Sequence, residues 1–356
     1  MVLAAPGALD ALGDHVRAAA PAYRYVIITD ETVGALYGQR AAASFAGTDT
    51  VEILTIPPGE SMKTRDTWSA LTDQMLAAQY GRDTTVIALG GGVVGDLAGF
   101  VAATYMRGVP VVQVPTTLLA MIDAAIGGKT GVDTPRGKNL VGAFHPPAAV
   151  VVDQMVLASL PLAVLKAGMA EAIKHGVIAD EAYFDRCVAV IPTLLAPGGT
   201  HSPAMGRLIA GSIGIKEHIV GQDAREGGVR KILNFGHTIG HAVETLSGYA
   251  LLHGEAVAIG MTAESMLAER VGVAAPGTAT RVRNALTRAG LPVAIPSGIA
   301  PSDVVALTHG DKKRRGATIE YALPRAIGTM AGADSGWAVA VDDKMVRATL
   351  DDVYRS

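Results

Sequence analysis

The sequence predicts an α/β protein in two parts, a parallel-sheet domain over residues 1–160 and a mostly α-helical domain over residues 161–356. In the first part, short β-branched runs alternate with helix-like segments, which is typical of a parallel sheet with crossover helices. In the second part, Ala, Leu, Met, Glu and Lys recur at helical spacing. A chain of 356 residues is long enough for each part to bury its own core.

Five runs in the first part are predicted as strands, and nearly every one ends in a loop that carries Gly, Pro, Asp or Thr. They cover residues 25–29, 51–56, 85–89, 111–114 and 149–152. Open α/β sheets bind ligands beyond the carboxyl ends of their strands, so a site is expected at those ends. In the second part we predict helices at 167–178, 205–220 and 253–271, and a short β pair between 318–323 and 328–332.

The composition excludes several classes of function. Lys and Arg total 30 against 33 Asp and Glu, the net charge is -3, and no dense basic run occurs, so nucleic acid is not expected as a partner. The single cysteine, Cys187, excludes an intramolecular disulfide and indicates a reducing cytoplasm. No secretory signal is apparent, and the longest uncharged apolar stretch, 108–122, is too short and too interrupted to span a membrane.

Three histidines and a glutamate have spacings that suit a metal site. His237 and His241 are four residues apart, so on a helix they share one face, and His253 follows shortly after them. Glu171 lies earlier in the chain. Two imidazoles and one carboxylate, with one position left open for substrate, suit a catalytic Zn²⁺ ion. Spacing alone does not say which two histidines bind the ion, and a lone histidine is more often a hydrogen-bonded core or surface residue.

A glycine-rich turn follows the predicted strand 85–89. It runs from Gly90 to Asp96 and leads into a helix-like segment. Glycines in this position let backbone amides approach a pyrophosphate, and the helix N-terminus adds partial positive charge. Nucleotide binding is therefore predicted here. The turn departs from the usual G-x-G-x-x-G pattern, and a tight strand-to-helix connection would also need glycines.

The stretch 123–139 is predicted as a Gly-rich loop that binds phosphate or carboxylate. It concentrates Asp123, Lys129, Lys138 and Asn139 among small apolar residues. The alternative is a solvated surface loop, which charged residues usually indicate. Further candidate anion contacts are Lys174, Lys216, Arg230, Lys312 and Lys313.

In their order along the chain, ten runs resemble the 3-dehydroquinate synthase family, sugar phosphate cyclases of the shikimate pathway. They are 58–63 (PGESMK), 90–100 (GGGVVGDLAGF), 105–108 (YMRG), 115–119 (PTTLL), 127–131 (GGKTG), 137–139 (GKN), 170–174 (AEAIK), 233–241 (LNFGHTIGH), 253–256 (HGEA) and 311–313 (DKK). The resemblance implies a Rossmann-like NAD-binding domain followed by a helical metal- and substrate-binding domain. It further implies NAD and Zn²⁺, or Co²⁺, as cofactors.

The resemblance also implies roles for single residues. The metal ligands would be Glu171, His237 and His253, with His241 left to contact substrate. NAD would be bound by Asp30, Glu60, Lys63, Gly92, Val93, Val94, Gly95, Asp96, Thr116, Thr117, Lys129, Lys138 and the segment from Val156 to Ser159. Substrate contacts would be Asp123, Lys129, Asn139, Lys174, Lys216, Arg230, Asn234, His241 and one of Lys312 or Lys313. Arg107 would be lent to the neighbouring active site of a homodimer.

The implied reaction converts 3-deoxy-D-arabino-heptulosonate 7-phosphate to 3-dehydroquinate and inorganic phosphate. NAD transiently oxidises the substrate, phosphate is eliminated, the hydride is returned, and an intramolecular aldol reaction closes the ring. Alternatives are an aminodehydroquinate synthase or another cyclase of secondary metabolism, a metal-dependent polyol dehydrogenase of the same two-domain plan, and a non-catalytic binding module.

Two positions depart from the family pattern. Between Gly131 and Gly137 the family more often has Val-Asn-His-Pro-Leu, whereas this chain has Val-Asp-Thr-Pro-Arg, which adds Asp133 and Arg136 beside the substrate loop. The family's usual opening strand is also not expected before Ala22.

Overall fold

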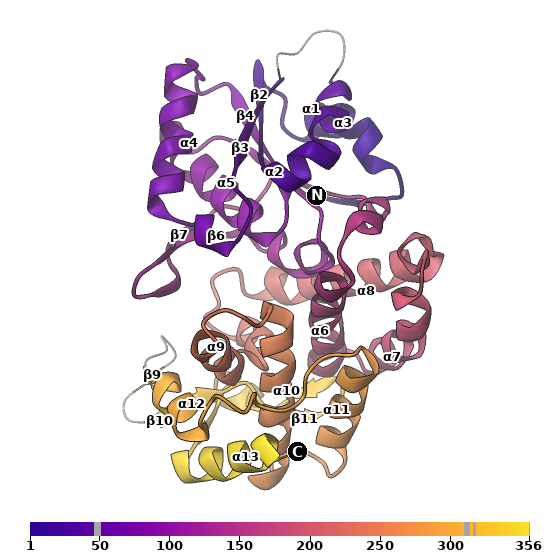
Figure 1. The fold of residues 1–356 in the computed structure, drawn as a ribbon, viewed down its shortest axis with the longest axis vertical. Helices are drawn as coiled ribbons and strands as arrows, with labels where there is room; N and C mark the ends of the chain where they lie inside the picture. Colours follow the sequence, from indigo (N-terminus) through magenta and orange to yellow (C-terminus); the bar gives the residue numbers. More distant parts are fainter. Residues whose placement is uncertain (46–50, 310–313, 316–317, 356) are drawn as a thin grey trace. The chain divides into compact units, whose positions relative to one another are not determined.

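The computed structural model describes residues 1–45, 51–309, 314–315 and 318–355 (Figure 1). The described chain forms two compact units. The first contains Met1–Leu160 together with Thr200–Ile213, and the second contains Pro161–Gly199 together with Gly214–Ser356. Within the described ranges, no helix combines the length and the apolar character that crossing a bilayer requires.

A six-stranded parallel sheet forms the centre of the first unit. Its strand order is β1-β8-β5-β4-β2-β3. The five predicted strands are confirmed as β2 (Arg24–Asp30), β3 (Val51–Ile56), β4 (Thr84–Gly90), β5 (Val111–Pro115) and β8 (Ala149–Val152). Every residue of β4 is buried, as expected for a central strand of a sheet that is covered on both faces.

The expectation that no strand precedes Ala22 is wrong. Residues Val2–Ala4 form β1, which pairs in parallel with β8 at the edge of the sheet. The Ala5 N–H continues this ladder by donating to the Val152 carbonyl at 3.0 Å. A three-residue edge strand is too short to show an alternating pattern, so the sequence carries no clear signal for it.

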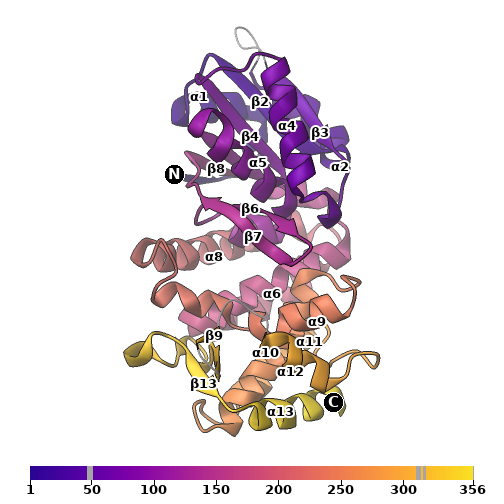
Figure 2. The ribbon, with the colours of Figure 1, turned by 90° about the vertical axis from the view of Figure 1, so that its left-hand side faces the viewer.

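Among the described residues, five α-helices lie between β1 and β5 along the chain, and the last two of them share an apolar core with the sheet. They are α1 (Leu12–Ala19), α2 (Glu31–Val33), α3 (Gln39–Ala43), α4 (Arg65–Ala77) and α5 (Gly92–Thr104). Leu71 of α4 and Leu97 of α5 are buried in one cluster with Val26 and Val86 of the sheet. Figure 2 shows α4 and α5 lying along the sheet. The glycine-rich turn lies between β4 and α5, so the carboxyl end of a central strand leads directly into a helix N-terminus.

The stretch predicted as a Gly-rich loop is largely a β-hairpin. β6 (Lys129–Thr134) pairs with β7 (Gly137–Phe144) in an antiparallel ladder. Glycines bring the two backbones together, since a Cβ on Gly142 would lie 2.0 Å from the Thr130 carbonyl oxygen. Strands rich in Gly and Lys have low β-propensity, which is why the sequence reads as a loop.

The second unit is mostly helical, as predicted. Its helices are α6 (Leu162–Ala179), α7 (Glu181–Leu195), α9 (His237–Leu246), α10 (His253–Arg270), α11 (Thr278–Arg288), α12 (Pro301–Thr308) and α13 (Asp343–Arg355), and α8 (Pro203–Gln222) has residues in both units. The predicted pairing of 318–323 with 328–332 is wrong. Instead, β10 (Thr318–Tyr321) pairs with β9 (Arg314–Arg315) and β13 (Val339–Val341), while β11 (Pro324–Ala326) pairs with β12 (Thr329–Met330).

Helices α9 and α10 pack unusually closely. A Cβ on Gly260 of α10 would lie 1.9 Å from the carbonyl oxygen of Gly236, the residue that precedes α9. One turn along, a Cβ on Gly240 would lie 3.0 Å from the Ala256 carbonyl oxygen. Small residues at both of these contacts allow the two helices to approach closely. The contacts also position His237 and His253, the first residues of the two helices.

Candidate active site

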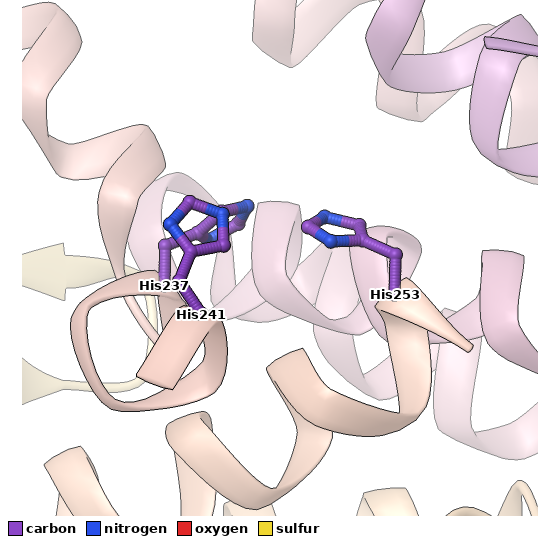
Figure 3. Close-up of side chains that lie close together, drawn as sticks. All are labelled: His237, His241 and His253. Carbon is purple, nitrogen blue, oxygen red and sulfur yellow. The ribbon is translucent and has the colours of Figure 1, made fainter. Parts of the chain in front are cut away.

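Three histidines of the second unit converge (Figure 3). His237 and His241 lie one turn apart on α9, and His253 is the first residue of α10. Their ring centroids are separated by 5.2 Å for His237 and His241, 5.3 Å for His237 and His253, and 5.8 Å for His241 and His253. One ring nitrogen of each lies within 4.8 Å of the others. The structure therefore brings together the three histidines that the spacing singled out.

Glu171 of α6 completes a set of groups suited to a cation. Its side chain is fully buried, and Oε1 lies 3.7 Å from Nε2 of His237 and 3.9 Å from Nε2 of His253. Within the described part of the chain, neither carboxylate oxygen has a hydrogen bond of good geometry, although Lys174 forms an ion pair with the group from the next turn. A buried carboxylate that faces two imidazole nitrogens fits a Zn²⁺-like ion, because the ion would bind Oε1, the oxygen that is not paired with Lys174.

The other ring nitrogens of these histidines contact protein acceptors. Nδ1 of His237 lies 3.2 Å from the Phe235 carbonyl oxygen, and Nδ1 of His253 lies 3.5 Å from Oε2 of the buried Glu244. Burial alone would lower the pKa of His253, but the hydrogen bond and charge of Glu244 outweigh it and raise that pKa. Contacts of this kind fix the ring orientation and leave Nε2 for the cation. Sequence reasoning missed Glu244, although it lies two turns after His237 on one helix face.

A second buried carboxylate fixes the start of α9. Glu264 of α10 is fully buried, and it accepts hydrogen bonds from the Gly236 N–H at 2.6 Å and the Ile239 N–H at 3.1 Å. Gly236, the N-cap residue, has no side chain to cap the helix, so a neighbouring helix supplies the acceptor. The negative charge also complements the helix dipole. Sequence reasoning missed this residue because the contact exists only once α9 and α10 are packed.

Replacing Glu264 with alanine is expected to lower the free energy of unfolding by about 3 kcal/mol, because two buried N–H groups would lose their acceptor. Glu264→Gln keeps one acceptor oxygen and should cost less. The exposed Glu217 of α8 offers a control, and Glu217→Ala should change the same free energy by no more than about 0.5 kcal/mol. Urea denaturation followed by circular dichroism measures all three. Equal stability of Glu264→Ala and wild type would contradict the capping role.

The predicted anion-binding residues of the second unit include two buried cations. Lys216 is 6 % exposed and Arg230 is 1 % exposed. The loop before Arg230 is organised by Asp223, whose carboxylate accepts backbone N–H groups of Gly227, Gly228 and Arg230 itself. Asn234 donates from Nδ2 to Glu226 Oε1 at 2.7 Å. Cations withdrawn from water bind an anionic group more strongly than solvated ones do.

In the first unit, the residues assigned to NAD form linked contacts around the glycine-rich turn. Lys63 is 4 % exposed and pairs with Asp96 of α5, and Lys138 of β7 lies 3.1 Å from Glu60. Burial would lower the pKa of Lys63, but Asp96 and Glu60 outweigh it and raise that pKa, so the side chain stays charged. A Cβ on Gly90 would lie 2.6 Å from the Val94 Cβ, so glycine is needed for the helix to follow the strand this closely.

The remaining residues assigned to NAD lie at strand ends of the same unit. Asp30 ends β2 and accepts the Val33 N–H at 2.9 Å, and Thr117 caps the next turn through the Ala120 N–H at 3.1 Å. The phenol of Tyr37 donates to the Val156 carbonyl at 3.0 Å and lies 2.8 Å from Ser159 Oγ. Tyr37 was missed by the sequence analysis, because its link to this segment spans more than one hundred residues of sequence.

Three further predicted residues have distinct settings. Asp123 lies in the turn Ala120–Ala124, and Lys129 begins β6, both in the first unit. Arg107 is exposed and has a φ of 70°, directly after Met106 with a φ of 51°. Two consecutive non-glycine residues in left-handed conformations store strain, which is most common at functional positions. Lys312 and Lys313 lie outside the described residues.

Solved structures with this fold define a class of enzyme. A 2-deoxy-scyllo-inosose synthase in complex with carbaglucose-6-phosphate, NAD+ and Co²⁺ superposes with a TM-score of 0.89 at 26 % identity, over 99 % of this chain and 96 % of that one. A 2-epi-5-epi-valiolone synthase from Streptomyces hygroscopicus subsp. jinggangensis 5008, with NAD+ and Zn²⁺ bound, gives 0.87 at 30 % identity, over 100 % and 96 %. A probable glycerol dehydrogenase from Sinorhizobium meliloti 1021 shares the fold alone, at 0.67 and 17 % identity over 99 % and 96 %. The fold is that of the sugar phosphate cyclases.

Sequence comparison is more specific. Family models described as 3-dehydroquinate synthase N-terminal and C-terminal match residues 53–167 and 168–314. The 3-dehydroquinate synthase of Symbiobacterium thermophilum is 47 % identical over 89 % of this chain and 89 % of its own length. That of Caulobacter vibrioides is 42 % identical over 98 % and 94 %. The chain belongs to the 3-dehydroquinate synthase family and is an enzyme.

Proposed function

We propose that this chain is a carbon–oxygen lyase that converts 3-deoxy-D-arabino-heptulosonate 7-phosphate to 3-dehydroquinate and phosphate, by transient oxidation, phosphate elimination, re-reduction and intramolecular aldol closure. The observation that carries the proposal is the buried Glu171 carboxylate facing Nε2 of His237 and His253. It occurs in a chain 47 % identical to a named synthase over most of its length. The reaction serves the shikimate pathway, and with a single cysteine in the chain we place it in the cytoplasm.

Glu171, His237 and His253 hold the metal ion, Zn²⁺ or Co²⁺, as two solved cyclases contain one or the other. When bound, the cation stabilises negative charge on a substrate oxygen, and NAD takes up and returns a hydride. The protein's part is electrostatic and geometric. Glu171 provides the anionic ligand, while Glu244 and the Phe235 carbonyl orient the two rings. His241, exposed on the same helix face, is left to contact substrate.

In the first unit, the residues around the glycine-rich turn bind NAD. The Lys63–Asp96 and Lys138–Glu60 ion pairs support this site, since they fix the loops that surround the N-terminus of α5. The full set is Asp30, Glu60, Lys63, Gly92 to Asp96, Thr116, Thr117, Lys129, Lys138 and the segment from Val156 to Ser159.

The substrate's two anionic groups are matched by different residues. Lys216 and Arg230 bind the carboxylate, and their burial supports this role because a desolvated cation discriminates strongly for an anion. The phosphate is bound by Lys129, Asn139, Asn234 and one of Lys312 or Lys313, with Arg107 of the partner subunit. Asp123, Lys174 and His241 complete the contacts. Holding both ends confines the substrate to one conformer through the closing steps.

The active unit is a homodimer that shares Arg107 between sites. The left-handed backbone conformation of this exposed arginine supports the assignment, because such conformations are most common at functional positions. The backbone conformation sets the direction in which the exposed side chain leaves the chain.

Other cyclases of secondary metabolism form the second candidate, favoured by the fold match with TM-scores of 0.89 and 0.87. The presence of Lys216, Arg230, Asn234 and His241, the substrate contacts that the family resemblance implies, and the higher identity of 47 % to a 3-dehydroquinate synthase argue against most of them. An aminodehydroquinate synthase would keep all four.

Product identification tests the proposed function. We expect the purified enzyme with NAD and Zn²⁺ to convert the heptulosonate phosphate to 3-dehydroquinate, identified by NMR, and to prefer it to the aminated analogue. Exhaustive chelation should abolish turnover, and either Zn²⁺ or Co²⁺ should restore it, since both accept two imidazoles and one carboxylate. Preference for the aminated substrate would move the assignment to secondary metabolism, and activity that survives chelation would contradict the metal site.

A further inference from the structure

Asp133 lies where the β6–β7 hairpin changes register. The strands pair residue by residue from Lys129 opposite Phe144 to Val132 opposite Val141, and the next pair is Thr134 opposite Gly137. Asp133 falls in the irregularity between them. Its backbone N–H points out of the ladder and donates to the Lys63 carbonyl at 2.7 Å. The bulge is therefore anchored to the segment that carries the candidate NAD residues.

The Asp133 side chain turns back across the hairpin. Its Oδ1 accepts the backbone N–H of Asn139 at 2.8 Å. Asn139 has a φ of 54°, a left-handed conformation that asparagine adopts more readily than most residues with a side chain, but less readily than glycine. A charge-assisted hydrogen bond to this N–H stabilises Asn139 in that conformation. The backbone conformation in turn sets the direction in which the Asn139 side chain leaves the strand.

Charged groups of both neighbouring segments act on Asp133. Burial raises the pKa of its carboxyl group and the charge of Glu60 acts in the same direction, whereas Lys63, the Asn139 N–H and Lys138 oppose the rise. Lys138 is itself paired with Glu60 at 3.1 Å. Two lysines and the Asn139 N–H therefore favour the ionised carboxylate, whereas burial and Glu60 oppose it.

We propose that Asp133 is a positioning residue that sets substrate affinity by fixing the backbone conformation of Asn139. This rests on the proposed function, in which Asn139 contacts the sugar phosphate. The family more often has asparagine at this position, so the bond to Asn139 can be kept by an amide oxygen. The carboxylate of Asp133 accepts a stronger hydrogen bond from the Asn139 N–H than a neutral amide oxygen would.

Steady-state kinetics with a double-mutant cycle test the inference. Asp133→Ala should lower kcat/KM for the heptulosonate phosphate about tenfold, mainly by raising KM, whereas Asp133→Asn should lose no more than about threefold. The Kd for NAD, measured by calorimetry, should change less than about twofold in both variants. Asn139→Gly removes the side chain and tolerates the left-handed conformation, so adding Asp133→Ala to it should change kcat/KM by less than about twofold.

Two further measurements keep the outcomes distinct. Arg136→Ala, at the exposed turn of the same hairpin, is the control and should leave kcat/KM and the NAD affinity unchanged. Amide hydrogen exchange of Asn139 should be faster in Asp133→Ala than in wild type and unchanged in Asp133→Asn, a readout that needs no turnover. If wild type releases no phosphate, the proposed function fails, yet this exchange result still tests the contact.

Either of two results would overturn the inference. Equal losses from Asp133→Ala in the wild-type and Asn139→Gly backgrounds would show that Asp133 does not act through Asn139. Unchanged exchange of the Asn139 amide would show that the hydrogen bond does not hold that segment.

Discussion

Replacing Glu171 with glutamine is expected to remove the bound metal and lower kcat about a thousandfold, equivalent to ~4 kcal/mol of transition-state stabilisation. Glu171 is the anionic member of the proposed ligand set, and its Oε1 faces Nε2 of both His237 and His253. The neutral amide would also leave the buried ammonium of Lys174 without its counter-ion. Metal content per subunit after dialysis, together with kcat at saturating substrate, measures the effect.

Glu244 provides the matched control for this experiment. It is buried beside the same histidine, but it contacts Nδ1 of His253, the nitrogen that is turned away from Glu171. Glu244→Gln should therefore keep the metal at saturating concentration and weaken its affinity by about 10- to 100-fold. Full metal content and full activity in Glu171→Gln would refute the ligand assignment.

Arg107→Ala is expected to be inactive alone and to regain activity when mixed with an equally inactive His237→Ala variant. In a shared-site dimer, each mixed dimer has one site with an intact metal centre and an intact partner arginine. After random exchange of equal amounts, half of the dimers are mixed and each has one working site of two, so about one quarter of wild-type activity should return. Phosphate release before and after subunit exchange, with gel filtration to confirm exchange, measures the rescue.

The control for rescue mixes His237→Ala with Glu171→Gln. Both changes damage the same group of ligands within one subunit, so no combination of these subunits restores a complete site. No rescue is expected. A failure of Arg107→Ala and His237→Ala to complement after demonstrated exchange would argue that Arg107 serves its own subunit.

The elements with strong periodic signals were predictable from sequence. β-branched runs of four or more residues became β2, β3, β4, β5 and β8. The predicted first and last residues of α6, α8 and α10 lie within five residues of those in the structure. β1 and the β6–β7 hairpin were missed for opposite reasons. The first is too short to show a pattern, and the second has Gly and Lys where strands usually have β-branched residues. The pairing of β10 with β13 depends on a partner that is distant in sequence.

Some contacts of the candidate site were likewise predictable from the sequence, and others were not. The four-residue spacing of His237 and His241 predicts a shared helix face, and the structure places their rings 5.2 Å apart. The spacing could not select His253 over His241 as a ligand, whereas the 3.9 Å distance from His253 to Glu171 favours it. Glu264 caps a helix other than its own, and this contact could not be predicted, because it is created by tertiary packing rather than by local sequence.

The most direct test of the central claim is the ratio of phosphate released to NAD supplied. The enzyme is incubated with 3-deoxy-D-arabino-heptulosonate 7-phosphate, Zn²⁺ and sub-stoichiometric NAD while absorbance at about 340 nm reports NADH, the reduced form of the hydride-carrying cofactor. A cyclase that recycles its cofactor releases many phosphates per NAD without accumulating NADH, and this is the result we predict. NADH that accumulates with a simple polyol, in the absence of phosphate release from the heptulosonate phosphate, would instead identify a dehydrogenase and contradict the account.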